Sequence, residues 1–167
     1  MPDSQKWRAP EALTADHDVS GFDCGEAVLD LWLKHTVLRN ERRNASRTYV
    51  LCVEQRVVAY YCLSTGSITS ELTPSRMRRN MPDPIPVMVL GRLAIALAWH
   101  RQGFGKALLH DAILRALHVS EMIGVTALMV HALSDQAVQF YQAQGFQPSP
   151  MSPRTLFLLL QDIRKAI

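Results

Sequence analysis

The feature that most constrains the fold is an apolar, strand-like run that ends in a glycine-containing loop and continues into an amphipathic helix. The run VMVLGRLAIA occupies residues 87–96, and the loop HRQGFGK at 100–106 leads into a helical pattern that reaches about Ser120. A buried strand that feeds a helix through a short loop is typical of α/β proteins. The sequence therefore predicts an α/β fold built around this strand and helix.

The apolar spacing alternates along the chain between the periods of helices and of strands. The expected elements are a helix at 25–44, a β-hairpin at 48–68 that turns at Glu54–Gln55–Arg56, a short helix or turn at 71–86, a strand at 87–96, a helix at 106–120, a strand at 125–133, a helix at 134–145 and a strand at 154–160. Ser134 or Asp135 is expected to cap the last of these helices, and Gly145 to end it. Since no repeat or linker interrupts the pattern, we expect one domain over residues 1–167.

Composition and charge narrow the class of protein. The start of the chain lacks the apolar run of a signal or anchor, and no later stretch is apolar enough to span a bilayer, so no membrane association is expected. The three cysteines and six histidines show no metal-ligand spacing, and we expect reduced thiols, no metal and a cytoplasmic location. Residues 31–110 hold twelve Lys/Arg against four Asp/Glu. This excess indicates an anionic partner or cofactor, although a solvated basic surface has the same composition.

The glycine loop lacks the spacing of two common phosphate-binding motifs. A P-loop needs a glycine where His100 stands, and a dinucleotide fingerprint needs a third glycine where Leu108 stands. Gly103 and Gly105 still let backbone amides turn toward an anion without a Cβ in the way, and the helix start adds its own amides and positive dipole end. From spacing alone, the loop is either an anion cradle or only a turn that guides the chain.

Two stretches resemble the GNAT family of N-acetyltransferases: LGRLAIALAWHRQGFGKALL, which resembles the family's acetyl-coenzyme A segment, and SDQAVQFYQAQGF, which resembles its helix with a tyrosine before a terminal GF. The resemblance implies a single-domain α/β fold with a mixed central sheet flanked by helices, and acetyl-coenzyme A as co-substrate. It also implies that the strand backbone binds the pantetheine arm and that the loop amides bind the pyrophosphate. The matching positions are Leu93, Ala94 and Ile95 on the strand and Arg101, Gln102, Gly103, Phe104, Gly105 and Lys106 in the loop. His100 departs from the family, whose loops carry Gln or Arg at that position.

The N-terminal half resembles one group within this family. The segments FDCGEAVLDLWLKH, RTYVLCVEQRVVAYYCLSTGSI and VMVLGRLAI look like the acetyltransferase toxins of bacterial toxin–antitoxin pairs, and the likeness extends from Phe22 to Leu160. It implies an enzyme that acetylates the α-amine of aminoacyl-tRNA and stops translation. It also implies a ribbon–helix–helix antitoxin as partner, and a homodimer.

The chemistry of acetyl transfer agrees with an α-amine substrate. The amine must be unprotonated, and no Asp or Glu lies between Asp83 and Asp111 to act as its base. An α-amine has a pKa of about 7.7–8.0 and is partly unprotonated at neutral pH, whereas a lysine amine at about 10.4 is not. Tyr141 is the candidate general acid that protonates the departing thiolate. The alternative is that VQFY is only the buried stripe of a short helix, and the family resemblance favours the acid.

Arginine clusters are the candidates for tRNA contact. One contains Arg39, Arg42 and Arg43, with Arg47 just beyond, and the other contains Arg76, Arg78 and Arg79. Such clusters bind phosphate backbones, although a charge run alone is more often a solvated surface. Two other functions stay open: a GNAT acetyltransferase of a small-molecule amine or a protein N-terminus, and a non-catalytic coenzyme A-binding regulator.

Overall fold

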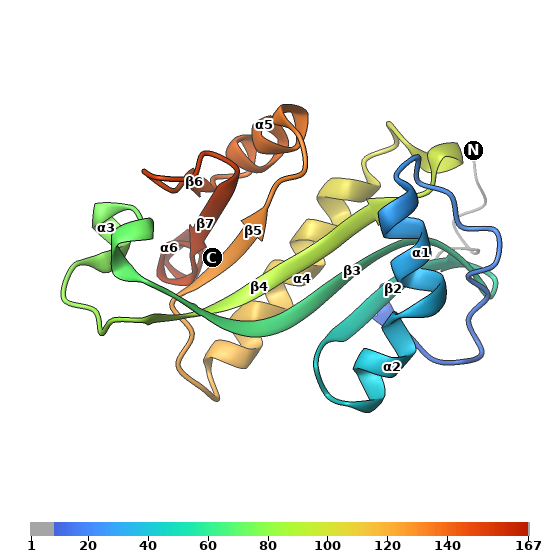
Figure 1. The fold of residues 1–167 in the computed structure, drawn as a ribbon, viewed down its shortest axis with the longest axis horizontal. Helices are drawn as coiled ribbons and strands as arrows, with labels where there is room; N and C mark the ends of the chain where they lie inside the picture. The colour runs from blue at the N-terminus through green and yellow to red at the C-terminus, as the bar shows by residue number, and fades with distance from the viewer. Residues whose placement is uncertain (1–8, 167) are drawn as a thin grey trace. The chain divides into compact units, whose positions relative to one another are not determined.

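A computed structural model describes residues 9–166, in which a mixed seven-stranded sheet is flanked by helices (Figure 1). The strands are β1 (Glu11–Ala12), β2 (Arg47–Val53), β3 (Arg56–Ile68), β4 (Ile85–Ile95), β5 (Ala127–His131), β6 (Gln147–Pro148) and β7 (Thr155–Leu159). The helices are α1 (Ala27–His35), α2 (Val37–Arg42), α3 (Ser75–Arg78), α4 (Phe104–Ser120), α5 (Asp135–Ala143) and α6 (Leu160–Ala166), with 3-10 turns η2 (Ser70–Leu72) and η3 (Leu97–Trp99). The strand order β1-β2-β3-β4-β5-β7-β6 confirms the predicted α/β class with a mixed sheet.

The chain divides into two compact units. Unit 1 comprises residues up to 64 and residues 92–112, and unit 2 comprises residues 65–91 and those from 113 onward. Strands β3 and β4 and helix α4 contribute residues to both units. The single N-acetyltransferase domain expected over residues 1–167 stays a prediction.

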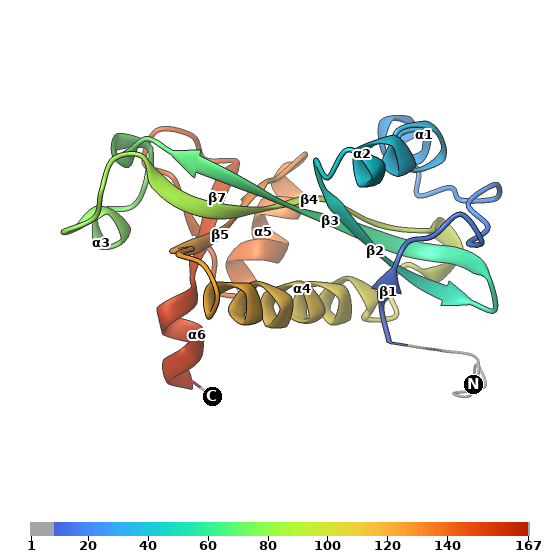
Figure 2. The same cartoon turned by 90° about the horizontal axis from the view of Figure 1, so that it is seen from below.

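Unit 1 is built around the predicted hairpin. Strands β2 and β3 pair antiparallel, with Val53 opposite Arg56, so the turn consists of Glu54 and Gln55, and Glu54 has a φ of 59°. Helices α1 and α2 lie on one face of this part of the sheet, and the first turns of α4 lie on the other (Figure 2). The core under α1 includes Phe22, Leu33 and Tyr60, and the Tyr60 hydroxyl donates to the Leu29 carbonyl at 2.7 Å.

The helix expected over 25–44 is broken at Thr36. This residue ends α1 with a φ of −110°, and its amide donates to the Trp32 carbonyl at 2.9 Å. The next residue, Val37, begins α2 and is buried in the core of unit 1. Thr and Val are both β-branched and lose side-chain freedom inside a helix, which makes this point a favourable place for a break.

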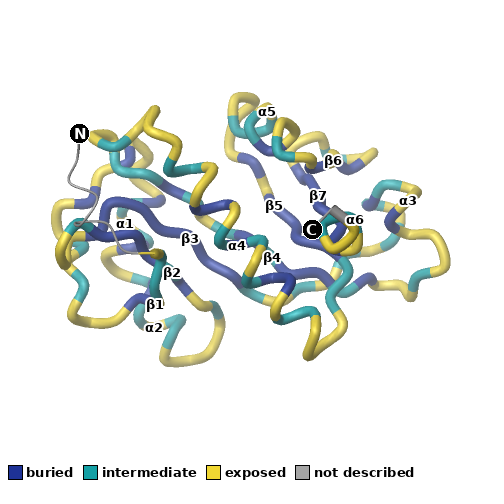
Figure 3. The backbone as a smooth tube through the Cα atoms, turned by 180° about the vertical axis from the view of Figure 1, so that it is seen from behind, coloured by how far each residue is buried: buried dark blue, intermediate teal, exposed yellow. Residues whose placement is uncertain are grey.

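Unit 2 is organised around β5, which pairs parallel with β4 and antiparallel with β7. Strands β5 and β7 are buried along almost their whole length (Figure 3), which explains their continuous apolar sequences. The Ser134 hydroxyl caps α5 by accepting from the Ala137 amide at 3.1 Å. Gly145 takes a φ of 100° just after the helix, while the Phe146 amide donates to the Tyr141 carbonyl. Both expected ends of α5 are confirmed.

Three elements differ from the sequence-based expectation. Helix α6 begins directly at Leu160, where the last strand was expected to end, and it was not predicted. The two-residue strands β1 and β6 were not predicted either, because two residues are too short to show a period. Among the described residues, no helix combines the length and the apolar character that crossing a bilayer requires.

Candidate active site

Strand β4, the expected pantetheine-binding strand, is irregular at Arg92. This residue has a φ of 59°, a left-handed conformation that non-glycine residues rarely adopt in a strand. Such a conformation costs of order 1–3 kcal/mol and persists only where the surroundings enforce it. The following positions differ in exposure, because Ala94 is buried while Leu93 and Ile95 are half-buried. Arg92 was not predicted as a site residue, because a backbone dihedral angle leaves no signature in the sequence.

The glycine loop in unit 1 has the backbone conformation of an anion-binding turn. Arg101 and Gly103 have φ values of 63° and 83°, so the chain turns twice within three residues. A Cβ added at Gly103 would meet no atom within 4 Å, so the space beside this glycine is open. Left-handed residues next to right-handed ones point successive amides into one concavity, the arrangement that binds phosphates. The loop therefore fits the pyrophosphate of acetyl-coenzyme A.

Helix α4 begins directly in this loop. It starts at Phe104, two residues earlier than expected, and the Gly103 carbonyl accepts from the Ala107 amide at 3.1 Å. The Phe104 ring packs edge-on against Trp99 with centroids 6.1 Å apart, which anchors the helix start. The first amides of a helix have no acceptor within it and carry the positive end of its dipole. Gly105 and Lys106 lie in this first turn, and their part in binding the pyrophosphate stays a prediction.

His100 makes a contact that the sequence did not reveal. Its Nε2 donates to the Ile95 carbonyl at 2.6 Å, so the side chain bridges the end of β4 and the start of the loop. The family resemblance left the role of a histidine at this position in doubt. The structure gives it a bracing role, because the hydrogen bond closes the turn that precedes Arg101.

The carboxylate nearest in sequence after the loop is already engaged. Asp111 on α4 accepts a hydrogen bond from the hydroxyl of the fully buried Tyr61. A carboxylate held in this way is a poor candidate for a general base. The observation agrees with the lack of any other Asp or Glu between residues 83 and 111.

Tyr141 lies on α5 in unit 2. Its side chain is buried between Phe140 and Phe146, whose ring centroids are 5.2 Å and 5.3 Å away. Burial raises the pKa of the Tyr141 phenol to about 12. Among the described residues its hydroxyl has no hydrogen-bond partner. A phenol that keeps its proton at neutral pH and donates it to no other group can act as a general acid.

The first arginine cluster lies on α2 and just beyond it. Arg39, Arg42 and Arg43 are exposed; the first two lie one turn apart on one side of α2, and Arg43 is the residue at which the helix ends. Among residues 9–166 none of the three guanidinium groups has an ion pair or hydrogen bond. Arg47, by contrast, donates to the Glu41 carboxylate at 3.2 Å. The α2 cluster is therefore a concentration of uncompensated positive charge.

The second cluster, on α3 in unit 2, is largely engaged. Arg76 forms a bidentate ion pair with Asp162 on α6, which lowers the pKa of that carboxyl group. Arg78 donates to the Thr73 carbonyl at 3.3 Å. Arg79 is exposed and has no such partner in the described part of the chain. The role of this cluster in tRNA binding stays a prediction, but two of its three arginines have protein partners.

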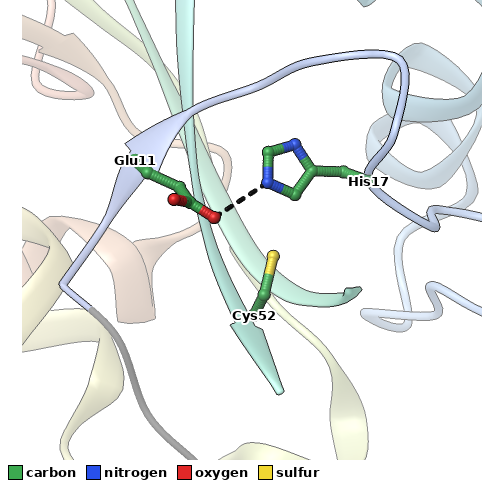
Figure 4. A group of neighbouring side chains, drawn as sticks. All are labelled: Glu11, His17 and Cys52. Atoms are coloured by element: carbon green, nitrogen blue, oxygen red, sulfur yellow. Dashed lines mark hydrogen bonds and ion pairs between the residues drawn. The ribbon is translucent and has the colours of Figure 1, made fainter. Parts of the chain in front are cut away.

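One group of side chains in unit 1 resembles a metal site in its composition. Glu11, His17 and Cys52 place one ligand atom each within 4.8 Å of one another (Figure 4). However, the Thr14 amide donates to His17 Nδ1 at 2.9 Å, so the proton of a neutral imidazole lies on Nε2 and is donated to Glu11 at 2.9 Å. A protonated Nε2 does not bind a metal. The group is better explained as a hydrogen-bonded pair that fastens β1 to the loop after it.

Known proteins resemble this chain over nearly its whole length. A sequence profile of the acetyltransferase (GNAT) domain matches residues 44–148. A tRNA-acetylating toxin of Mycobacterium tuberculosis (strain ATCC 25618 / H37Rv) is 42% identical over 161 residues, which are 96% of this chain and 97% of the toxin. The solved structure of AtaT complexed with acetyl-methionyl-tRNAfMet is similar with a TM-score of 0.89 and 33% identity, over 96% of this chain and 98% of AtaT. An AtaT variant with a tyrosine replaced by phenylalanine, bound to the C-terminus of the antitoxin AtaR and acetyl-CoA, gives a TM-score of 0.82 and 31% identity, over 96% of this chain and 97% of that one.

Proposed function

We propose that this chain, which belongs to the GNAT acetyltransferase family, is an acetyl-coenzyme A-dependent toxin. In this proposal it acetylates the α-amine of aminoacyl-tRNA and so blocks translation. The observation that carries the proposal is the 42% identity with a tRNA-acetylating toxin over 96% of this chain. The similarity thus includes both the glycine loop and the α5 tyrosine. The complex of the related AtaT with acetyl-methionyl-tRNAfMet supports the same substrate class.

The loop binds the co-substrate, and strand β4 orients it. The amides of Gly103, Gly105 and Lys106 bind the pyrophosphate, for which the open space at Gly103 leaves room. The backbone at Leu93 and Ile95 orients the pantetheine arm along β4. When bound, acetyl-coenzyme A supplies the acetyl group as a thioester.

The proton steps need only one side chain. The α-amine of the substrate is partly unprotonated at neutral pH and needs no dedicated carboxylate. The Tyr141 phenol holds a proton for the sulfur that leaves, and its burial keeps that proton in place at neutral pH. The amine nitrogen loses one proton when the amide forms and the carbon–sulfur bond breaks, and that proton restores the phenol, so the transfer needs no second side chain.

The proposal extends to partners and location. A ribbon–helix–helix antitoxin and a homodimer follow from the likeness to the toxin group, and the AtaT complex with the C-terminus of AtaR supports an antitoxin partner. A cytoplasmic location follows from the substrate, because charged tRNA is found where proteins are made. The α2 cluster of Arg39, Arg42 and Arg43 is the best candidate for contact with the tRNA backbone, since its charge is uncompensated.

The test incubates the protein with labelled acetyl-coenzyme A and a pool of charged tRNAs. We expect label in the tRNA fraction that alkaline hydrolysis releases as an N-acetyl amino acid, and no label on uncharged tRNA. Labelling of free amines or peptide N-termini, with charged tRNA inert, would instead support a small-molecule or N-terminal acetyltransferase. Cofactor binding without transfer to any acceptor would support a non-catalytic regulator.

A further inference from the structure

The guanidinium of Arg92 lies over an aromatic ring, and its N–H groups have no acceptor among the described residues. Its guanidinium carbon lies 4.7 Å from the centroid of the Trp32 ring on α1, and the other contact of that ring is a parallel stack with the buried Tyr60. A stacked guanidinium uses its face for the ring and keeps its N–H groups at the edge for an acceptor. Among residues 9–166, Arg92 has no ion pair or hydrogen bond, and its side chain is exposed.

The backbone conformation at Arg92 is one that a glycine would adopt at a lower energetic cost. The residue has a φ of 59°, a conformation that glycine adopts without cost, and the preceding residue is Gly91. The strained position thus carries a long cation although the neighbouring position carries no side chain. Strained residues of this kind gather at ligand-binding sites.

The position of the guanidinium separates it from the site expected for the pyrophosphate. Arg92 contacts α1, and α1 lies on the face of unit 1 opposite to the start of α4 (Figure 2). At the same time Arg92 directly precedes Leu93, where the backbone is expected to orient the pantetheine arm and therefore the acetyl group. The cation therefore directly precedes the segment expected to orient the pantetheine arm, and it contacts the helix on the face opposite to the expected phosphate site.

We propose that Arg92, oriented by Trp32, binds a phosphodiester at the 3′ end of the acceptor strand of the aminoacyl-tRNA. The inference rests on the proposed function. An aminoacyl ester is carried on the terminal ribose, and the nearest anion to its α-amine is the phosphodiester that links this nucleotide to the one before it. The planar guanidinium, with two parallel N–H donors, matches two phosphate oxygens. Arg92 thus positions the acceptor and takes no part in proton transfer.

The experiment compares two small acceptors that differ only in that phosphodiester: an aminoacyl ester of adenosine, and the same ester of cytidylyl-adenosine. Each carries the amino acid that is acetylated fastest in the charged-tRNA assay. The measured quantity is the ratio of kcat/KM for the dinucleotide to kcat/KM for the nucleoside. We expect the parent to prefer the dinucleotide about tenfold to a hundredfold, the usual range for a hydrogen bond to a charged group. Arg92→Gln should bring the ratio close to one, and Arg92→Lys should keep part of it.

Three controls separate this role from others. Arg56→Gln, which removes an exposed arginine at the hairpin turn, should keep the parent's ratio. Arg92→Gly removes the guanidinium but suits the backbone, so its melting temperature should stay at or above the parent's while the ratio is lost. Titration with acetyl-coenzyme A should give the parent's affinity for Arg92→Gln.

The outcomes distinguish the two levels of inference. The assignment of Arg92 would be overturned by a parent ratio near one or by an unchanged ratio in Arg92→Gln. A loss of acetyl-coenzyme A affinity in Arg92→Gln would also overturn it, because the guanidinium would then bind a cofactor phosphate. If the parent acetylates neither ester nor any charged tRNA, the proposed function itself fails. A ratio that falls in both Arg92→Gln and Arg92→Gly, in folded protein, supports the assignment.

Discussion

At the scale of single residues, the clearest assignment of a chemical role is that of Tyr141. Its ring is packed between Phe140 and Phe146, while its hydroxyl donates to no other described group. Burial raises the pKa of the phenol from 10 to about 12, so it stays protonated at neutral pH, where part of the substrate amine is free. The packing role and the chemical role of this side chain therefore belong to different atoms, and one substitution can separate them.

Tyr141→Phe should lower the rate of acetyl transfer by about 10²–10⁴-fold, the usual worth of a positioned acid or base. The ring stays in place and no intramolecular hydrogen bond is lost, so the melting temperature should change little. Single-turnover acetylation of charged tRNA measures the rate, and a growth assay should show survival where expression of the parent arrests cells. Tyr49→Phe, which removes a hydroxyl from β2, serves as the control for the chemistry and should keep the parent's rate of acetyl transfer. Full activity of the Tyr141 variant would leave protonation of the thiolate to solvent.

At the scale of elements, the turn between β4 and α4 combines three devices that serve one purpose. His100 ties the loop to the Ile95 carbonyl, Phe104 packs on Trp99, and Gly103 supplies the left-handed turn. The first two fix the start of the helix, and the third leaves open space beside the amides. Rigid ends around an open centre are what a preorganised phosphate site requires.

Gly103→Val should weaken binding of acetyl-coenzyme A by about tenfold or more. The left-handed conformation costs a non-glycine residue roughly 1–2 kcal/mol, and the added side chain occupies the space beside the amides. Gly105→Val should act in the same direction. Calorimetric titration of folded protein measures the effect. Gly124→Ala is the matched control, because a Cβ there also meets nothing within 4 Å and its φ is not left-handed. Parent-like affinity in both loop variants would show that the loop only guides the chain.

The two arginine clusters should differ in their importance for tRNA binding. Changing Arg39, Arg42 and Arg43 together to Gln should weaken binding and lower the slope of log K against log salt by about two to three, because each lost phosphate contact removes nearly one unit. The same change of Arg76, Arg78 and Arg79 should have the smaller effect, since Arg76 is paired with Asp162 and Arg78 with a carbonyl. Binding measured at several salt concentrations compares them. Equal losses from both clusters would contradict this ranking.

The elements that could be predicted are those that depend on residues close together in the sequence. The hairpin turn at Glu54 and Gln55, the Ser134 cap and the end of α5 at Gly145 all follow from short-range periodicity and turn chemistry. The break at Thr36, the helix α6 and the ion pair between Arg76 and Asp162 depend on packing or on residues far apart in the sequence. The same holds for the site. The glycine loop could be located from its spacing, but the strain at Arg92 and its stacking on Trp32 could not.

At the scale of the whole molecule, the core contains several groups that burial keeps neutral at alkaline pH. Cys24, Cys62 and Tyr60 all lie in the core of unit 1, and Tyr141 is buried in unit 2. Burial raises the pKa of the Cys24 thiol to about 11 and of the Cys62 thiol to about 12, and it raises the pKa of Tyr60 still further. The stability of the fold is therefore linked to alkaline pH, in unit 1 through groups to which no catalytic role is assigned.

This linkage predicts a loss of stability at alkaline pH that one substitution should reduce. Below about pH 8 these thiols and phenols are almost wholly neutral in both the folded and the unfolded chain, so they add little pH dependence. Above about pH 8 the unfolded chain loses protons first, and the free energy of unfolding falls as the pH rises toward about 11 and 12, the values for Cys24 and Cys62. The melting temperature should thus drop between pH 8 and pH 10.5 at constant ionic strength. Cys62→Ser replaces the thiol by a hydroxyl that does not titrate in this pH range and can still accept from the Thr48 hydroxyl. The melting temperature of the variant should therefore fall less steeply with pH than the parent's. Parallel curves for parent and variant would show that the Cys62 thiol ionises as readily in the folded chain as in the unfolded one.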